Sequence, residues 1–264
     1  MEKRSLGSTG IRVSLLGLGT VKLGRVAQLK YPHPFTIPDD AAVLRLLDCA
    51  KDLGINIIDT APAYGNSEAR LGGLIGADRK RWILCTKVGE RFENGRSHYD
   101  FSPGAVRQSV RQSMRLLRTD YLDVVLIHSD GRDRAILEDE GALQVLQDLK
   151  QEGWIRAVGI SHKTEEGARL AMTQGCDVIM ATLNLQNQQE ADVIAEAGRQ
   201  GCGVLVKKAL ASGHSSVSGL AYVAAQTGVS SIVVGTISPA HLRQNAAAVA
   251  ASWKDGHGNC LDPG

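Results

Sequence analysis

The strongest constraint on the fold of this chain is a regular alternation of short apolar segments with longer amphipathic ones. Eight apolar segments have the composition of strands, at residues 15–19, 55–59, 82–87, 122–128, 155–160, 178–183, 203–208 and 231–235. Eight helical patterns follow them in turn, at residues 39–52, 67–75, 103–117, 142–151, 164–173, 189–200, 217–227 and 239–252. Strands that alternate with helices pair in parallel, and strands that are apolar throughout are covered on both faces. The chain of 264 residues is close to the ~250 residues of a (β/α)8 TIM barrel, which is the α/β fold that we predict.

A doubly wound open sheet is the competing architecture. Its dinucleotide-binding members carry G-x-G-x-x-G after the first strand, whereas Gly17-Leu18-Gly19-Thr20 lacks the third glycine and does not open a helix. Residues 3–14 predict a short N-terminal β-hairpin around the turn Gly7-Ser8-Thr9-Gly10. No linker interrupts the pattern, so we expect a single barrel domain over residues 1–252 and a flexible C-terminal tail over residues 253–264.

Composition narrows the classes of function. The net charge is +2 with both signs well mixed, which predicts no nucleic-acid partner and no membrane-surface partner. No apolar run approaches the ~20 residues of a membrane span, and the charged start of the chain does not resemble a signal peptide, so we expect a cytoplasmic protein. The five cysteines are scattered without metal-ligand spacing, which predicts reduced, buried thiols and no metal.

Polar residues stand where three of the predicted strands end. Asp59, Lys87 and His128 are the last residues of their apolar segments, and Tyr64 lies in the loop after Asp59. Because the active site of a barrel lies at the carboxyl ends of its strands, we expect these four side chains to converge.

These four residue types suit the protonation of a carbonyl oxygen. A free tyrosine, with a pKa of ~10, is a weak donor at neutral pH, and a neighbouring ammonium such as that of Lys87 lowers that pKa. Asp59 would keep Lys87 charged, and a neutral His128 could hydrogen-bond the same substrate oxygen. No side chain can supply a hydride, so the reaction would need a cofactor.

Several motifs in this order resemble the aldo-keto reductase family. They are the opening Arg4-x-Leu6-Gly7-x-Thr9-Gly10-Ile11 with Leu16-Gly17-Leu18-Gly19-Thr20, the block from Gly54 to Glu68, Thr86-Lys87, Ile127-His128-Ser129 and Val158-Gly159-Ile160-Ser161. The resemblance covers residues 3 to about 250 and is to a short, bacterial-type member. It implies a (β/α)8 oxidoreductase that uses NADP(H), or NAD(H), on an aldehyde, ketone or sugar. We expect a monomer or a small homo-oligomer.

The resemblance also assigns roles to residues. It implies that Tyr64 is the general acid/base, that Lys87 and Asp59 tune it, and that His128 orients the carbonyl. The positions that it implies for cofactor binding are Gly19, Thr20, Asp59, Ser161, His162, Lys207, Gly235, Thr236, Ser238, His241 and Asn245.

The chain departs from the family pattern at several of these positions. Met180 stands where the family has a glutamine, and Lys207 stands where an aromatic residue stacks on the nicotinamide. Ile237 falls near the position of the cation that holds the 2′-phosphate of NADPH, and His241 replaces an arginine of some members. A 2′-phosphate pairs best with a guanidinium, so a preference for NADPH is in doubt unless Arg243 or Lys207 compensates.

For two loop segments and for His162 the sequence allows more than one interpretation. The loop at residues 211–217 is short for a cofactor lid, which predicts an open site for bulky substrates. Residues 31–35 either wall the substrate pocket or form a solvated connector, and His162 either contacts the cofactor or caps a helix. Two other functions remain possible: a cofactor-binding regulatory subunit without significant turnover, and an aldolase-like enzyme with Lys87 as its Schiff base.

Overall fold

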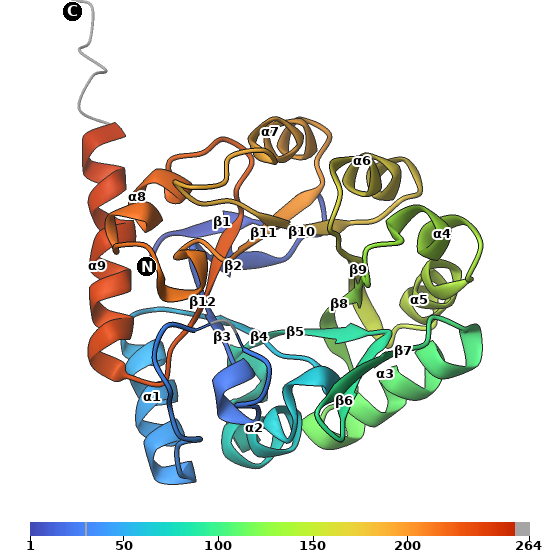
Figure 1. The fold of residues 1–264 in the computed structure, drawn as a ribbon, viewed down its shortest axis with the longest axis horizontal. Coiled ribbons are helices and arrows are strands. Elements are labelled where there is room, and N and C mark those ends of the chain that lie inside the picture. Colours follow the sequence, from blue (N-terminus) through green and yellow to red (C-terminus); the bar gives the residue numbers. More distant parts are fainter. Residues whose placement is uncertain (30, 257–264) are drawn as a thin grey trace, which may run out of the picture.

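The predicted barrel is confirmed. In the computed structural model, which describes residues 1–29 and 31–256 with side chains as far as residue 251, parallel strands close into a barrel in the order β10-β11-β12-β3-β4-β5-β8-β9 (Figure 1). Their bounds are β3 (Leu16–Gly19), β4 (Ile57–Asp59), β5 (Ile83–Val88), β8 (Leu122–His128), β9 (Ile155–Ser161), β10 (Val178–Thr182), β11 (Gly203–Lys207) and β12 (Ser231–Gly235). Each predicted strand agrees with the observed one within two residues at either end.

Helices surround the barrel and follow the predicted order. They are α1 (Asp40–Asp52), α2 (Ser67–Ile75), α3 (Pro103–Leu117), α5 (Ala142–Gln151), α6 (Glu165–Thr173), α7 (Ala191–Arg199), α8 (Ser218–Ala224) and α9 (Pro239–Gly256). Asp39 caps α1 by accepting a hydrogen bond from Ala42 N at 2.7 Å, and Pro103 opens α3, where no amide hydrogen is needed. Helix α9 continues to Gly256, past the predicted end at Ser252, and the rest of the predicted tail lies outside the described residues.

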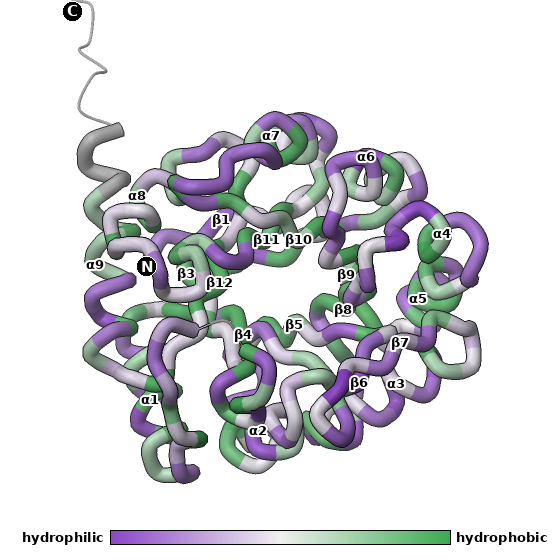
Figure 2. The backbone as a smooth tube through the Cα atoms, viewed as in Figure 1, coloured by the Kyte–Doolittle hydropathy of each residue, from purple (hydrophilic) through white to green (hydrophobic). Residues whose placement is uncertain are grey.

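The strands bury both of their faces. Along β8, Val124 and Leu126 point into the barrel and contact its inner apolar cluster, while Val125 and Ile127 contact the outer cluster beneath the helices. This alternation is the normal geometry of a strand, whose successive side chains point to opposite faces. Figure 2 shows apolar residues concentrated along the strands. Full burial of one such side chain contributes about 1.5–3 kcal/mol to folding.

The predicted N-terminal hairpin closes the barrel at the amino ends of its strands. Strands β1 (Lys3–Ser5) and β2 (Arg12–Ser14) pair antiparallel. Leu6, Ile11 and Val13 of this hairpin belong to the same apolar cluster as the inward residues of the barrel. The barrel interior is therefore packed at the amino ends of the strands, and the inward residues at their carboxyl ends form the mouth.

Two insertions on the carboxyl side were not predicted. A second hairpin, β6 (Glu90–Glu93) with β7 (Arg96–Tyr99), lies between β5 and α3, and the short helix α4 (Asp133–Glu138) follows β8. The turn of the hairpin is Asn94-Gly95, with φ of 51° and 76°. Asn-Gly is the preferred pair for a two-residue turn in which both residues have positive φ, so the sequence did carry a signal for this hairpin.

Candidate active site

The last inward-facing position of each barrel strand forms a ring at the mouth. Every second side chain of a strand points into the barrel. Ile57 and Leu205 belong to the inner apolar cluster, so Asp59 and Lys207, two residues later on the same strands, also point inward. The members of the ring are Gly19, Asp59, Lys87, His128, Ser161, Thr182, Lys207 and Gly235. Seven of these eight had been singled out from the sequence, and Thr182 was missed.

Asp59 and Lys87 form a buried ion pair on this ring. Lys87 Nζ donates to Asp59 Oδ1 at 2.6 Å and to the carbonyl oxygen of Thr60 at 2.9 Å, and Lys87 is 1% exposed. Burial alone would lower the pKa of Lys87, but the net shift is upward, and the charge of Asp59 is the largest effect that opposes burial. Lys87 is therefore a permanent ammonium at neutral pH, which argues against its use as a Schiff-base amine.

Tyr64 stands next to this pair. It ends the short 3-10 helix η2 (Pro62–Tyr64), and its ring centre lies 4.9 Å from Lys87 Nζ. The following turn needs glycine, because a Cβ on Gly65, whose φ is 63°, would lie 2.1 Å from the carbonyl oxygen of Gly24. This contact fixes the Tyr64 loop against the first loop of the barrel.

Burial controls the acidity of Tyr64. Burial raises the pKa of Tyr64 to about 12, with a smaller increase from Asp59, whereas the charge and the hydrogen bond of Lys87 lower it. The effect that the sequence predicted for Lys87 is present, but burial outweighs it. Tyr64 is therefore fully protonated at neutral pH.

His128 faces a carboxylate that the sequence analysis missed. His128 Nδ1 lies 2.7 Å from Glu90 Oε2, and Glu90 Oε1 accepts a hydrogen bond from Ser97 Oγ at 2.6 Å. Although burial opposes it, the hydrogen bond and charge of His128 and the bond from Ser97 lower the pKa of Glu90 to about 2. Burial lowers the pKa of His128, while Glu90 raises it; the net shift is downward. The hairpin β6–β7 thus supplies an anion that favours a hydrogen on Nδ1.

Tyr64 and His128 lie at one part of the mouth. Their ring centroids are 6.3 Å apart and their planes are nearly perpendicular. The structure therefore brings together the four side chains that the sequence predicted to converge, with Glu90 behind His128.

Lys207 and Ser161 contact each other beside the end of β10, which lies between their two strands. Lys207 Nζ donates to Ser161 Oγ at 2.9 Å and to the carbonyl oxygen of His162 at 2.8 Å. The His162 ring is turned to Glu190, with Nε2 2.7 Å from Glu190 Oε2, and its Nδ1 has no hydrogen-bond partner among the described residues. Helix α6 is capped by Thr164, whose side chain accepts from Gly167 N, so His162 does not provide this cap.

Two neighbouring strands end in glycine at the mouth. Gly19 and Gly235 are register partners of β3 and β12, and neither places a side chain on this part of the ring. A Cβ on Gly235 would lie 2.8 Å from the Tyr31 hydroxyl. Neither glycine contributes a side chain to this floor of the mouth, and the Tyr31 hydroxyl lies over it at Gly235.

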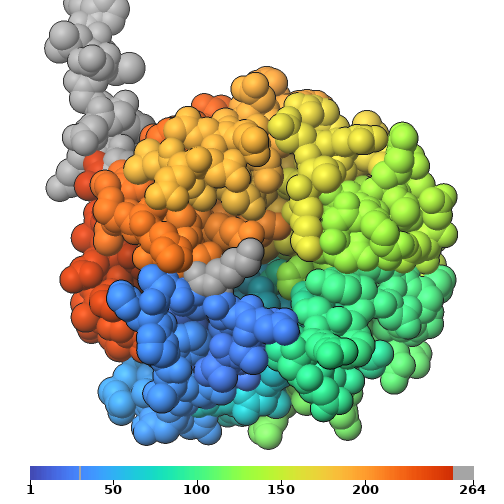
Figure 3. Space-filling model, viewed as in Figure 1, coloured from blue at the N-terminus to red at the C-terminus, as the bar shows by residue number. Residues whose placement is uncertain are grey.

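The first loop reaches across this floor. Tyr31 lies against Gly235, Pro32 lies near Gly213 of the loop after β11, and Lys22 Nζ stands 3.7 Å above the Tyr31 ring. In Figure 3 the blue segment of the first loop meets the orange segment after β11 on this face. Of the two alternatives for residues 31–35, the structure therefore favours a wall of the mouth, which Tyr31 forms.

The other predicted cofactor residues lie beside β12 and at the start of α9. Thr236 and Asn245 are buried, Ser238 Oγ accepts from His241 N at 3.3 Å, and His241 is exposed. Thr20 is buried and donates to the carbonyl oxygen of Asp59 at 2.9 Å, which positions the end of β4.

Met180 and Ile237, two of the departures from the family pattern, lie on opposite faces of the barrel sheet. Met180 belongs to the inner apolar cluster, and Ile237 packs against the outer one. Arg243 lies exposed on α9.

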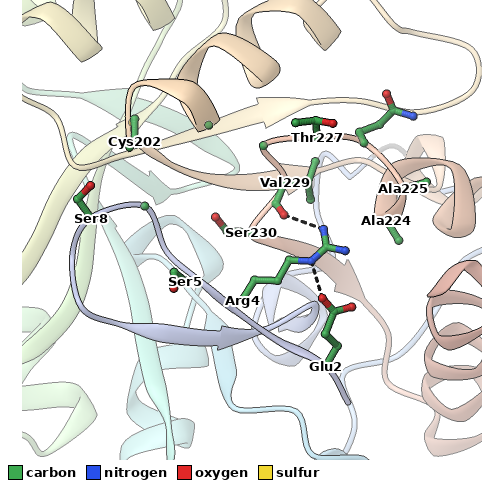
Figure 4. A pocket seen from close by; sticks show the side chains of 15 residues that line it. Glu2, Arg4, Ser5, Ser8, Cys202, Ala224, Ala225, Thr227, Val229 and Ser230 are labelled. Carbon is green, nitrogen blue, oxygen red and sulfur yellow. Dashed lines mark hydrogen bonds and ion pairs between the residues drawn. The ribbon is translucent and has the colours of Figure 1, made fainter. Parts of the chain in front are cut away.

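One pocket of the described residues lies away from the mouth. It measures about 800 Å³ and lies at the amino ends of β11 and β12, beside the N-terminal hairpin (Figure 4). Arg4 crosses it, donating to the carbonyl oxygen of Val229 and to Glu2, both at 2.9 Å. None of the predicted catalytic residues lines it.

The described residues contain no group of three or more His, Cys, Asp or Glu side chains that could hold a metal ion. Cys49, Cys85, Cys176 and Cys202 are buried free thiols, as predicted, and Cys260 lies outside the described residues. No helix within the described part of the chain is long and apolar enough to cross a membrane.

Comparison with known proteins establishes the family. A model of the aldo/keto reductase family matches residues 15–219. The chain belongs to the aldo/keto reductase family, as its motifs predicted.

Solved structures share its fold. It is 47% identical, with a TM-score of 0.88, to the crystal structure of a Pseudomonas aeruginosa protein described as an aldo-keto reductase, covering 95% of this chain and 96% of that one. The holo form of an aldo-keto reductase from Bacillus halodurans is 27% identical with a TM-score of 0.82, over 94% of this chain and 91% of that one.

Curated relatives are named oxidoreductases. L-galactose dehydrogenase of Arabidopsis thaliana is 37% identical over 169 residues, which are 61% of this chain and 48% of that protein. NADH-specific methylglyoxal reductase of Escherichia coli is 31% identical over 199 residues, or 70% of this chain and 60% of that protein. The chain spans about half the length of the first curated relatives that it matches.

Proposed function

We propose that this protein is an oxidoreductase that transfers a hydride between NADP(H) or NAD(H) and the carbonyl or alcohol carbon of an aldehyde, ketone or sugar. The observation that carries the proposal is the convergence of Tyr64 with the buried Asp59–Lys87 pair and with His128 at the barrel mouth. A site that only bound a cofactor would have no need of a buried ammonium beside a tyrosine hydroxyl.

Tyr64 is proposed as the proton donor in reduction. The bound nicotinamide supplies the hydride, which leaves negative charge on the substrate oxygen. Tyr64 is protonated at neutral pH, and the charge of Lys87 stabilises the phenolate that forms when the proton leaves. Asp59 keeps Lys87 charged and in place.

His128 is proposed to orient the substrate oxygen. With a hydrogen on Nδ1 facing Glu90, the other nitrogen is left for the substrate. A neutral ring would accept a hydrogen bond from an alcohol through Nε2, whereas a protonated ring would donate one to a carbonyl. The net pKa shift of His128 is downward, so the ring is mainly neutral at neutral pH; Glu90 opposes this shift, increases the share of protonated ring and is therefore a positioning residue for reduction.

The pKa of Tyr64 sets a preferred direction. Because that pKa is about 12, the acid form needed for reduction is present throughout the neutral range. The base form needed for alcohol oxidation grows about tenfold with each pH unit below that value. We therefore propose a reductase at neutral pH, with an oxidation rate that rises steadily toward alkaline pH.

The cofactor is proposed to lie over Gly19 and Gly235, with Ser161, Lys207 and the start of α9 near it. Ile237 places no cation at the expected 2′-phosphate position, and Arg243 is an exposed cation on α9 that could replace it. Parallel fluorescence titrations with NADPH and NADH test this arrangement. A preference for NADPH that disappears in Arg243→Gln would assign the 2′-phosphate contact to Arg243, and equal binding of both would mean that the site ignores the phosphate.

Replacement of Tyr64 tests the proposed function itself. In Tyr64→Phe we expect single-turnover hydride transfer to fall by about 10³-fold or more, while cofactor dissociation constants change by less than about twofold. Tyr222→Phe on α8, outside the barrel, is the matched control and should behave as the wild type. Turnover by Tyr64→Phe at a rate comparable to the control would show that Tyr64 is not the acid.

A further inference from the structure

The side chain of Lys207 stands opposite Lys87 on the ring of inward residues. The strand order of the barrel puts β11 and β5 on opposite sides. Lys207 is the last residue of β11 and is partly exposed, whereas Lys87 is fully buried. A molecule that enters the mouth can therefore reach the amine of Lys207.

The hydrogen-bond partners of Lys207 suit a free amine better than an ammonium ion. Its two acceptors, Ser161 Oγ and the carbonyl oxygen of His162, are both neutral. An amine has two hydrogens for these two oxygens, and its lone pair stays available, whereas an ammonium has a third hydrogen. Among the described residues no carboxylate forms an ion pair with Lys207, and the Glu190 carboxylate is engaged by the ring of His162.

Burial has a larger effect on the protonation of Lys207 than any of the charges around it. Glu190 and Asp133 favour the ammonium, whereas Lys208 and Lys87 oppose it. Burial is the largest effect and lowers the pKa of Lys207 to about 7. At neutral pH about half of such an amine is unprotonated, against about one in 3,000 for an ordinary lysine.

We propose that Lys207 is a second reactive group of the mouth, a nucleophile that forms a reversible imine with small aldehydes and ketones. The amine lone pair attacks the carbonyl carbon, and the carbonyl oxygen takes the proton that nitrogen loses. The resulting carbinolamine expels this oxygen as water while the C=N bond forms. Amine and carbonyl give imine and water with no change of oxidation state, so no cofactor takes part. The inference does not depend on the proposed hydride transfer.

Reductive trapping tests the proposal in the full-length protein without cofactor. The protein is incubated at pH 7 with glycolaldehyde and sodium cyanoborohydride, which converts an imine into a stable secondary amine, and the modified lysines are located by peptide mass spectrometry. We expect Lys207 to be modified about 100-fold faster than its exposed neighbour Lys208. In Lys207→Arg, which keeps a positive charge but is not a nucleophile under these conditions, the fast phase should disappear and the modification of Lys208 should be unchanged.

The pH dependence gives a second readout that needs no variant. Between pH 5 and pH 9 the modification rate of Lys207 should follow a titration with a midpoint near 7. The proposal is overturned if Lys207 reacts no faster than Lys208 in the wild-type protein, or if the fast phase survives in Lys207→Arg. Because Lys207 and Lys208 are compared within one molecule, the test holds even if the variant does not fold.

Discussion

Lys87 and Lys207 occupy equivalent positions on opposite sides of the barrel mouth, and their surroundings give them opposite chemistry. Each is the last inward side chain of its strand, and each has a hydroxyl-bearing residue beside it, Tyr64 for Lys87 and Ser161 for Lys207. The difference is the carboxylate of Asp59, 2.6 Å from Lys87 Nζ, because no described carboxylate forms an ion pair with Lys207. Burial favours the neutral amine at both positions, and the charge of the acceptor decides whether this effect is overcome, as at Lys87, or not, as at Lys207.

Removing the positive charge of Lys87 should have the largest effect on turnover. In Lys87→Met, Tyr64 loses the charge that stabilises its phenolate, and we expect turnover to fall by about 10³-fold. Asp59 is left buried and unpaired, which should lower the free energy of unfolding by about 3–5 kcal/mol. Steady-state kinetics and urea unfolding measure the two effects.

A double variant separates the two effects. Asp59→Asn combined with Lys87→Met removes both charges, so most of the lost stability should return while turnover stays low. If turnover recovers together with stability, the ammonium has only a structural role.

The second lysine can be made to resemble the first. In Ser161→Asp a carboxylate replaces the neutral oxygen 2.9 Å from Lys207 Nζ, which should raise the pKa of Lys207 toward that of an ordinary lysine. Reductive modification of Lys207 by glycolaldehyde at pH 7 should then slow by about 100-fold. Ser161→Asn, which has the same shape without the charge, is the control. Equal rates in the two variants would show that the charge of the acceptor does not govern Lys207.

The sequence predicted the barrel and the positions of both lysines because these depend on local patterns. The strand periodicity and the polar residue at the end of each apolar run are visible without knowledge of tertiary contacts. The ion pair of Asp59 and Lys87 was also foreseeable, since a lysine that ends a buried strand needs a counterion.

Three properties depended on packing and could not be foreseen. The pKa of Tyr64 is set by burial, which the loop sequence alone does not reveal. Glu90 reaches His128 only because the hairpin folds back over the mouth, although Asn94-Gly95 indicated its turn. The contact of Lys207 with Ser161 joins β11 to β9 past the end of β10, which lies between them, and the sequence suggested only a cofactor contact for Lys207.

The comparison also applies to His128. Glu90 opposes the effect of burial on the pKa of His128, as Asp59 does for Lys87. Glu90 raises the pKa of His128 against the larger effect of burial, so Glu90→Gln should lower that pKa further. Reduction at pH 7 should then fall about tenfold, and the pH at which the reduction rate declines should move down by about one unit. Glu93→Gln, an exposed residue of the same strand, is the control. A pH profile of Glu90→Gln that matches this control would mean that Glu90 does not act through His128.

The smallest expected effect is on stability, and its pH dependence identifies its cause. The pKa of Lys207 is lower in the folded protein than in the unfolded chain, about 7 against 10.5. The unfolded state therefore binds the extra proton between these values, and the resulting penalty on folding is full below pH 7 and disappears above pH 10.5. Since partial exposure screens the charge, we expect Lys207→Met to raise the free energy of unfolding by about 1–2 kcal/mol at pH 6 and by less than half of that at pH 9. Urea unfolding at the two pH values measures the difference, with Lys208→Met as the exposed control, expected to change stability by less than about 0.5 kcal/mol at both. If Lys207→Met raises the free energy of unfolding equally at pH 6 and pH 9, the increase comes from the added apolar surface alone. Lys207 would then be protonated at both pH values in the folded protein, as Lys87 is.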